Sequence, residues 1–260
     1  MPIAQGLHYE WFGEEGLPPV VLSSGLGGSA DYWEPNVLAL SGDYRVLVYD
    51  HRGIGRSDLT VETTSIASMA QDVVALLTEL ELDEPAGFVG HAIGGMIGLE
   101  VAMQAPELVS RVMVVNGWAT LDPFTARCFD VREALLGVSP QAYLKAQPLF
   151  LYPPAYVSEH DADLFKWEND ALDHFPQAET LLARIHAARM WDPGAARLGT
   201  IECPVMCLAS EDDALVPAVN SEKLAKLIPK GKLASMSSGG HAVNVTRPDE
   251  FNSRVIDFIR

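Results

Sequence analysis

Cysteine is scarce in this chain of 260 residues, which holds only Cys128, Cys203 and Cys207. An odd and low number provides no disulfide framework and is typical of a reducing compartment. Cys203 and Cys207 have neither the spacing nor the histidine neighbours of a zinc site, and Cys207 lies in an apolar run typical of a buried thiol. We therefore expect no metal and no other cofactor.

Basic residues are outnumbered, with 18 Lys and Arg against 35 Asp and Glu, and the formal net charge is -17 at pH 7. Such a surface disfavours nucleic acid and anionic membranes as partners. It also slows the arrival of an anionic substrate unless a local positive patch compensates. We expect a small molecule as the substrate, and the exposed surface could support a homodimer.

Long apolar runs are missing as well, because none approaches the ~20 residues that span a bilayer. The first residues, MPIAQGLHYEWFGEEG, lack the basic and apolar regions of a secretion signal. We therefore expect a cytoplasmic protein.

What the chain does contain is enough apolar material for a sizeable core, with 48% hydrophobic residues. Short apolar runs alternate with amphipathic patterns, which predicts a mostly parallel sheet with helices on both faces, an α/β fold. The predicted strands cover residues 18–25, 44–50, 86–91, 111–117, 203–210 and 232–237, and the predicted helices cover 65–82, 94–107, 218–228 and 249–259.

The alternation stops at about residue 118 and resumes at about 199. The stretch between shows helical patterns without a good strand, and it is too long for a loop and too short for an independent domain. We interpret residues 118–198 as a helical lid inserted into a sheet domain that comprises residues 1–117 and 199–260.

Residues 90–94 read Gly-His-Ala-Ile-Gly and lie between a predicted strand and a predicted helix. This is the context of the G-x-S-x-G nucleophile elbow, in which small flanking residues permit a sharp turn. Ala92 occupies the position of the nucleophile and provides none. The amide of Ile93, at the start of the helix, is predicted to point into the site.

Three other motifs each follow a predicted strand. SSGLGG follows the first, and the amide of its Leu26 is the candidate second donor of an oxyanion hole. SEDDALVP supplies an orienting acid, which we assign to Asp213 rather than to the more solvent-facing Asp212. SGGHAVN supplies His241 as the general base. The order Ala92, Asp213, His241 is the nucleophile–acid–base order of α/β-hydrolases.

Ala92 and His241 also have interpretations that involve no functional site. Ala92 between glycines could reflect close packing of a helix on a strand, and His241 could be an ordinary loop histidine. However, all four motifs follow predicted strands, and their order along the chain matches that of α/β-hydrolases, which favours a catalytic site.

Together these motifs resemble the α/β-hydrolase superfamily and, within it, the RutD proteins of the Rut pyrimidine-degradation pathway. The lid stretches matter most, because lids vary widely across the superfamily. The resemblance implies that alanine at the elbow is native, and Ser24, where a histidine usually precedes the oxyanion-loop glycine, agrees with it. The stretches that carry the likeness are 23–33, 50–55, 90–95, 115–136, 146–153 and 239–248.

The resemblance further implies a hydrolase of low turnover in pyrimidine (uracil) catabolism that releases ammonia from 3-aminoacrylate or carbamate. Without a serine, no acyl-enzyme can form at Ala92. We expect His241, oriented by Asp213, to move protons or activate water.

The substrate carboxylate needs its own partners in this acidic protein. The amides of Leu26 and Ile93 could hold it. Arg127 and Arg132 of the lid are the candidate cations.

Three alternatives remain open from the sequence. The chain could be a serine esterase in which serine was replaced by alanine as a trap. It could be a non-catalytic protein that binds a ligand in an α/β-hydrolase fold. It could also be a cofactor-free oxygenase or a lyase that uses the histidine and aspartate as a base.

Overall fold

The structure is a computed structural model that describes residues 2–59 and 64–260. Within these residues the centre of the molecule is an eight-stranded sheet in the order β1-β2-β4-β3-β5-β6-β7-β8. Neighbouring strands from β4 to β8 along this order run parallel, whereas β1 and β2 are antiparallel to their neighbours. The strands are β1 (Ile3–Ala4), β2 (Leu7–Phe12), β3 (Pro19–Ser23), β4 (Arg45–Tyr49), β5 (Ala86–His91), β6 (Val109–Val115), β7 (Val205–Ser210) and β8 (Gly231–Met236).

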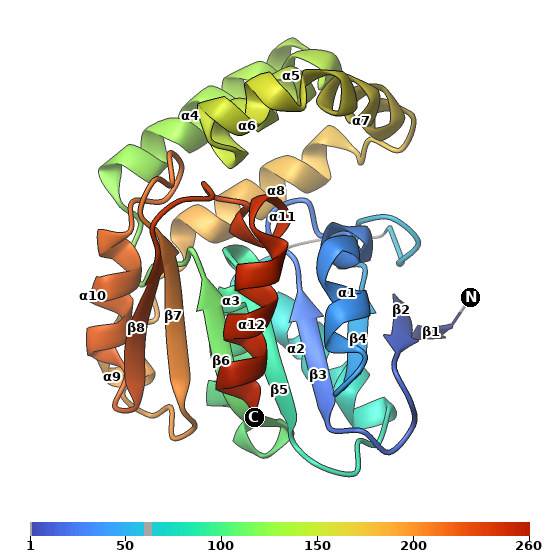
Figure 1. Ribbon diagram of the computed structural model, residues 1–260, viewed down its shortest axis with the longest axis vertical. Helices are drawn as coiled ribbons and strands as arrows, with labels where there is room; N and C mark the ends of the chain where they lie inside the picture. The colour runs from blue at the N-terminus through green and yellow to red at the C-terminus, as the bar shows by residue number, and fades with distance from the viewer. Residues whose placement is uncertain (1, 60–63) are drawn as a thin grey trace.

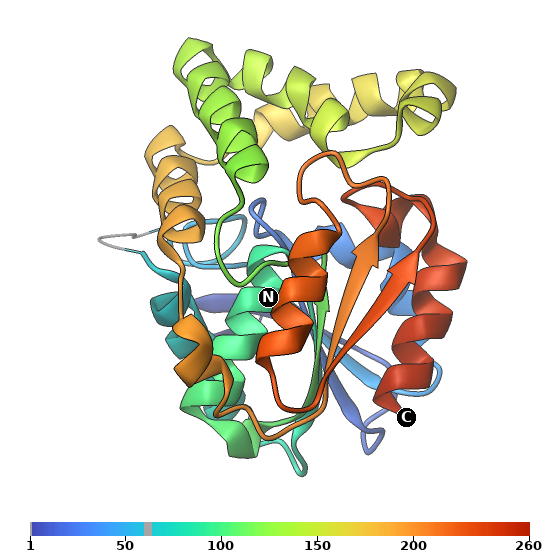
Figure 2. The same cartoon turned by 90° about the vertical axis from the view of Figure 1, so that its left-hand side faces the viewer.

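Helices cover both faces of the sheet, as the alternating pattern predicts (Figures 1 and 2). Side chains of successive strand residues point to opposite faces. On β3, Val21 joins the hydrophobic cluster on one face, while Val20 and Leu22 join the cluster on the other. The first cluster packs under α2 (Ile66–Glu79), α3 (Ile93–Gln104) and α10 (Val219–Leu227), and the second under α1 (Glu34–Leu40) and α12 (Pro248–Ile259).

The predicted α/β-hydrolase fold is confirmed, and the alternating elements lie within a few residues of their expected positions. The sequence did not predict β2, which pairs with β4 and places Tyr9 opposite Tyr49. Polar His8 and Glu10 interrupt its apolar pattern, yet His8 is fully buried.

Helices α4 to α8 lie together above the ends of the parallel strands (Figure 1). They occupy most of the segment 118–198 that the sequence predicts as an insertion. Its last helix, α9 (Gly194–Leu198), packs against α3 beside the sheet. The helices above the sheet are α4 (Pro123–Val138), α5 (Pro140–Leu151), α6 (Pro154–Glu159), α7 (Asp161–Asp173) and α8 (Ala178–Met190).

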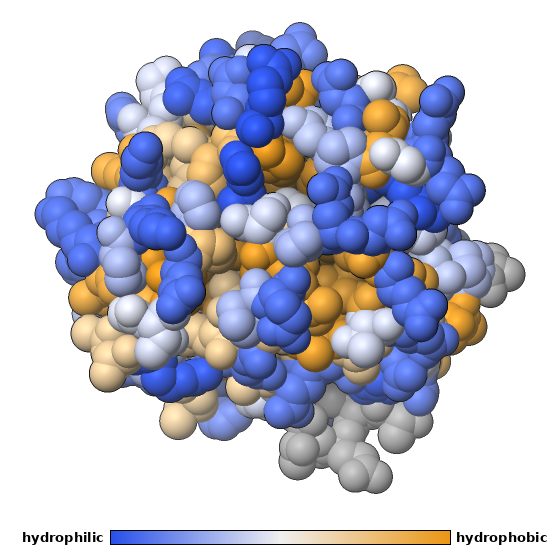
Figure 3. All heavy atoms as spheres, turned by 90° about the horizontal axis from the view of Figure 1, so that it is seen from below, coloured by the Kyte–Doolittle hydropathy of each residue, from blue (hydrophilic) through white to orange (hydrophobic). Residues whose placement is uncertain are grey.

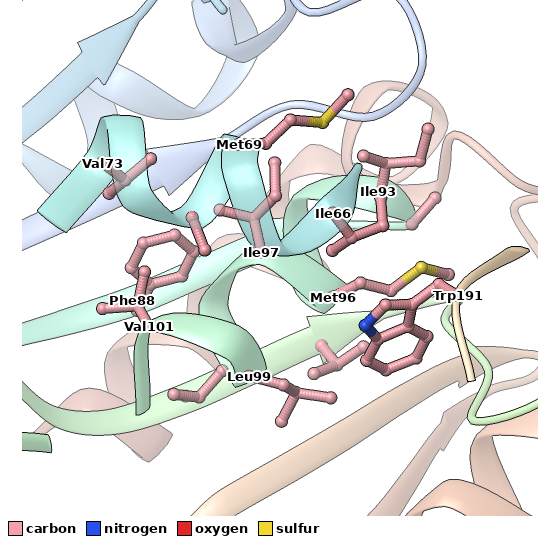
Figure 4. Close-up of a cluster of buried hydrophobic side chains, with 14 of the residues drawn as sticks. Ile66, Met69, Val73, Phe88, Ile93, Met96, Ile97, Leu99, Val101 and Trp191 are labelled. Carbon is pink, nitrogen blue, oxygen red and sulfur yellow. The ribbon is translucent and has the colours of Figure 1, made fainter. Parts of the chain in front are cut away.

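Helices α2 and α3 pack against each other through buried apolar side chains. Figure 4 shows Met69 and Ile66 of α2 close to Ile97 and Ile93 of α3, with Trp191 against Met96. Because Ile93 is also the first residue of α3, this contact holds the start of the helix that follows the elbow.

A buried carboxylate ties the end of the lid segment to this layer. Glu100 of α3 accepts hydrogen bonds from Trp191 Nε1 at 3.0 Å and from Arg197 Nη2 at 2.7 Å. Burial alone raises the pKa of Glu100, but the hydrogen bonds from Arg197, Trp191 and Gln104 outweigh burial and lower it.

The face opposite helices α4 to α7 carries hydrophilic side chains around patches of hydrophobic ones (Figure 3). In the described part of the chain no helix has both the length and the apolar character to cross a bilayer. The expected homodimer stays a prediction.

Replacing Glu100 by Gln is expected to lower the free energy of unfolding by about 1–3 kcal/mol at pH 7, because two charge-assisted hydrogen bonds are lost. The folded pKa lies below the ordinary 4.5, so the contribution of Glu100 is present above that pH and fades as pH falls further. Urea unfolding from pH 7 to pH 3.5 measures both effects. The exposed Glu107→Gln is the matched control, and an equal deficit at every pH would contradict the role of the charge.

Candidate active site

The turn between β5 and α3 has the strained backbone of a nucleophile elbow. Ala92 lies there with φ +48° and ψ -111°, a region that costs a residue with a side chain on the order of 1–3 kcal/mol. Its amide donates to Val115 O at 2.8 Å, which fixes the turn to the end of the neighbouring strand. The methyl carbon of Ala92 occupies the position of a serine Cβ, and it carries no oxygen.

The flanking glycines are required by contact and not merely by flexibility. A Cβ at Gly94 would overlap the carbonyl oxygen of Ser23, and one at Gly90 would overlap the backbone of Gly94. The elbow therefore presses directly on the end of β3, where the loop that contains Leu26 begins. Ile93 is the first residue of α3, so its amide has no acceptor within the helix and can serve a ligand.

His241 and Asp213 form a buried hydrogen-bonded pair. His241 Nδ1 lies 2.7 Å from Asp213 Oδ2. Because a carboxylate only accepts, Nδ1 carries the proton and Nε2 is the nitrogen that can exchange a proton with a substrate. The other oxygen, Oδ1, accepts from the amides of Leu215 at 2.7 Å and Val216 at 2.8 Å, so the carboxylate is held at both ends.

The loop that carries His241 is tied down from three directions. The carbonyl oxygen of His241 accepts from Asn116 Nδ2 and from His91 Nε2, each at 2.8 Å. The exposed Asp212 accepts from Gly240 N at 2.8 Å, so the neighbour of the orienting acid shapes the loop. From the end of α5, Leu151 O accepts from Ala242 N at 2.9 Å. These contacts fix the position of the imidazole.

His91 connects the elbow, the loop of His241 (the histidine loop) and the loop of residues 23–28, which is the predicted oxyanion loop. Its ring lies 4.5 Å from the ring of His241, centroid to centroid, and its Nδ1 faces Gly25, where a Cβ would approach it to 2.9 Å. Because the carbonyl of His241 accepts from Nε2, Nε2 carries the ring proton. Burial, and next the charge of His241, lower the pKa of His91 well below its ordinary value, although the bond to the His241 carbonyl opposes this. His91 is therefore a neutral support.

The oxyanion loop is held by a residue that the sequence did not reveal. Leu26 is buried, and its carbonyl accepts from Arg184 Nε of α8 at 2.8 Å. Arg184 has no sequence motif around it, and its partner lies 158 residues away, so local patterns gave no signal. Asn116 was missed for the same reason.

The two predicted lid cations differ in position. Arg132 is buried, and its Nη2 donates to Tyr143 OH at 3.0 Å and to Gln147 Oε1 at 2.6 Å. Among the described residues no carboxylate forms an ion pair with it. Arg127 is exposed, because five residues turn a helix by about 140° and place it on another side of α4. The structure does not bring Arg127 to the site.

A thiol does not replace the missing oxygen. Cys128 lies one helical turn before Arg132, and its Sγ is 3.9 Å from Ala214 O, next to the loop of Asp213. Burial raises the pKa of Cys128, the charge of Arg132 opposes this, and Asp213 adds to it. The thiol therefore stays protonated, and a thiolate nucleophile is not available there.

A second histidine–aspartate contact exists elsewhere in the molecule. His8 Nδ1 lies 3.6 Å from Asp50 Oδ2, which is beyond hydrogen-bond distance. Asp50 already accepts from Ala30 N and from Arg56, so it serves the turn after β4.

The chain is similar to known hydrolases in sequence. A family model described as "alpha/beta hydrolase fold" matches residues 18–141. A protein from Agrobacterium fabrum named "Putative carbamate hydrolase RutD" is 45% identical over 257 residues, which cover 97% of this chain and 98% of that protein. A protein of the same name from Azorhizobium caulinodans is 43% identical, covering 99% of this chain and 98% of its own length.

Solved structures show the same architecture. A hydrolase from Pseudomonas aeruginosa has a TM-score of 0.83 and 28% identity, covering 97% of this chain and 93% of that chain. An enol-lactonase from Burkholderia xenovorans has a TM-score of 0.86 and 25% identity, covering 97% and 95%.

Because His91 is neutral in the folded protein, we predict that the folded protein loses stability in acid. Below pH 6.5 the unfolded chain binds a proton at His91 that the folded chain does not, so the free energy of unfolding falls, by at most about 1.4 kcal/mol per pH unit for this group. Urea unfolding between pH 7.5 and pH 5 is expected to show a shallower pH slope in His91→Gln than in the wild type. Exposed His174→Gln is expected to keep the wild-type slope, and a slope unchanged in His91→Gln would show that His91 is protonated when folded.

Proposed function

Because this chain belongs to the α/β-hydrolase family and is a RutD-like hydrolase, we propose that it cleaves the carbon–nitrogen bond of carbamate or 3-aminoacrylate and releases ammonia. The observation that carries the proposal is the His241–Asp213 pair beside an elbow that holds a methyl group in place of a nucleophile. Such a pair can move protons but cannot form a covalent intermediate at Ala92.

For carbamate, the step is a proton transfer. Protonated His241 gives the proton on Nε2 to the carbamate nitrogen, the carbon–nitrogen bond breaks with its electron pair going to nitrogen, and ammonia and carbon dioxide leave. Solvent water then returns a proton to His241. Asp213 keeps Nδ1–H in place and stabilises the charged imidazole.

For 3-aminoacrylate, Nε2 of His241 acts twice, first as an acid and then as a base. His241 protonates the carbon next to the carboxylate and produces an iminium group. It then accepts a proton from the water that attacks this group, and the adduct collapses to malonic semialdehyde and ammonia. General acid–base catalysis of this kind contributes about 10²–10⁴-fold, which suits substrates that also decompose without an enzyme.

Both substrates are anions, and the site offers them amide donors and positive charge. We propose that the amides of Leu26 and Ile93 hold the carboxylate. Arg132 supports this assignment, because it is buried, has no acidic partner among the described residues, and has an Nε without a hydrogen bond. An anionic ligand would offset the cost of burying its charge.

The segment 118–198 is proposed to act as the lid of this site. Its Leu151 bonds to the histidine loop and its Arg184 to the oxyanion loop. We place the reaction in the cytoplasm and in pyrimidine catabolism, where RutD-like proteins are expected to release nitrogen from uracil. A cluster of uracil-degradation genes around the coding sequence would support this assignment.

Replacing His241 by Ala is expected to reduce the enzymatic part of ammonia release by about 10²–10⁴-fold, because the proton carrier is removed. Ammonia is measured from freshly generated carbamate and 3-aminoacrylate, after subtraction of the spontaneous rate. His174→Ala, an exposed histidine of the lid, is expected to retain the wild-type rate. An unchanged rate enhancement in His241→Ala would rule out His241 as the proton carrier.

Replacing Ala92 by Ser tests whether alanine is native to the mechanism. Loss of serine from a working triad costs about 10⁶ in kcat, so a disabled esterase would recover strong activity. In a RutD-like enzyme Ala92→Ser is expected to raise hydrolysis of 4-nitrophenyl acetate less than about tenfold. The double variant Ala92→Ser, His241→Ala provides the background rate. Strong esterase activity in the single variant would support a serine-to-alanine trap instead.

A further inference from the structure

Arg184 of α8 is a buried cation without an acidic partner. It is 1% exposed, and no carboxylate among the described residues forms an ion pair with it. Burial lowers the pKa of Arg184 to about 10, while Tyr49 and Tyr143 act in the opposite direction. The group therefore remains charged at neutral pH. Burying a charge without a counter-ion is costly, so its neighbours indicate what it does.

The guanidinium of Arg184 is bonded to the backbone of the oxyanion loop. Nε donates to Leu26 O at 2.8 Å and Nη2 donates to Gly25 O at 3.0 Å. A Cβ at Gly28 would lie 2.9 Å from Nη2, so the loop also packs on the guanidinium. One side chain from the lid segment thus contacts three residues of the loop.

These bonds fix the direction of the Leu26 amide. The peptide between Gly25 and Leu26 is planar and trans, so its carbonyl and its N–H point in opposite directions. Because Gly25 O faces Arg184, the N–H of Leu26 points away from the guanidinium. A cation on the carbonyl oxygen also polarises the peptide and makes its N–H a stronger donor.

We propose that Arg184 is a positioning residue for the oxyanion loop, which aims and strengthens the Leu26 N–H toward the carboxylate of a small anionic substrate. The inference deepens the proposed function and rests on it for the identity of the anion. The part of the inference that concerns the geometry of the loop is independent of the proposed function.

His51 keeps the guanidinium in this orientation. Arg184 Nη2 lies 3.0 Å from His51 Nδ1, and since a guanidinium only donates, Nδ1 carries a lone pair and Nε2 the proton. Nε2 is 3.4 Å from Ser23 Oγ, which is 2.7 Å from Tyr49 OH. Burial, and next the charge of Arg184, lower the pKa of His51 well below its ordinary value. His51 therefore accepts from Arg184 without adding a second charge.

Arginine suits this position because three acceptors surround one planar group. Lysine would retain the charge but could not reach both carbonyls and His51 in a fixed geometry. This difference separates the role of the charge from the role of the geometry.

The test compares Arg184→Gln and Arg184→Lys with Arg189→Gln, a control in the same helix that pairs with Asp130 at the surface. The first measurement is the amide resonance of Leu26 in ¹⁵N-labelled protein. Loss of the cation is expected to move both its ¹⁵N and its ¹H shifts upfield in Arg184→Gln and by a smaller amount in Arg184→Lys. Arg189→Gln is expected to leave them unchanged.

The second measurement is ammonia release from carbamate. Because the Leu26 amide holds the substrate in both ground and transition states, KM is expected to rise about 10- to 100-fold in Arg184→Gln with kcat nearly unchanged. Arg184→Lys is expected to recover part of this loss. A fall in kcat at constant KM would contradict the proposed role.

The two measurements separate the two proposals. If the wild type releases no ammonia above the spontaneous rate, the proposed function fails, while the Leu26 resonance still decides the role of Arg184. A Leu26 resonance that stays at its wild-type position in folded Arg184→Gln would overturn the inference. If Arg184→Gln does not fold, the same comparison is made with Arg184→Lys, which keeps the buried charge.

Discussion

The geometry of the site depends on a close backbone contact between Gly94 and Ser23. Gly94 lies against the carbonyl of Ser23 so tightly that no β-carbon fits between them. This contact joins the end of β3 to the elbow after β5, and it places the loop of Leu26 beside the first turn of α3. His91, the residue before Ala92, donates a hydrogen bond to the carbonyl of His241 and so fixes the histidine loop relative to the elbow. The ends of β3 and β5 thus position the amides of Leu26 and Ile93 and the imidazole of His241.

Charge is distributed unevenly between the surface and the interior. The chain carries a formal charge of -17, yet Arg132 and Arg184 are buried without acidic partners in the described part of the chain. By contrast, Arg197 pairs with the buried Glu100, as expected for a structural ion pair. The cost of leaving Arg132 uncompensated is understandable if an anion completes the site, whereas Arg184 donates to the carbonyls of Gly25 and Leu26. Carbamate and 3-aminoacrylate both have the required charge.

Features set by short stretches of sequence were predictable. The strand and helix rhythm gave the sheet, and the order of Ala92, Asp213 and His241 gave the candidate site, because each follows a recognisable strand. Features set by distant contacts were not. Arg184 binds a carbonyl 158 residues away, and Asn116 binds one 125 residues away. The pattern of α4 also could not choose between Arg127 and Arg132, because both lie in one motif and only packing decides which side faces inward.

The bond between Leu151 of the lid and Ala242 has a kinetic consequence. With the lid helices in place, His241 is 3% exposed and Ala92 is 5% exposed, so solvent hardly reaches either. If the segment 118–198 acts as the proposed lid, entry of substrate and escape of product require this bond and its neighbours to break. We then expect turnover to be limited by how often the helices separate, and a reaction with an intrinsically low barrier would gain little from faster chemistry at the imidazole.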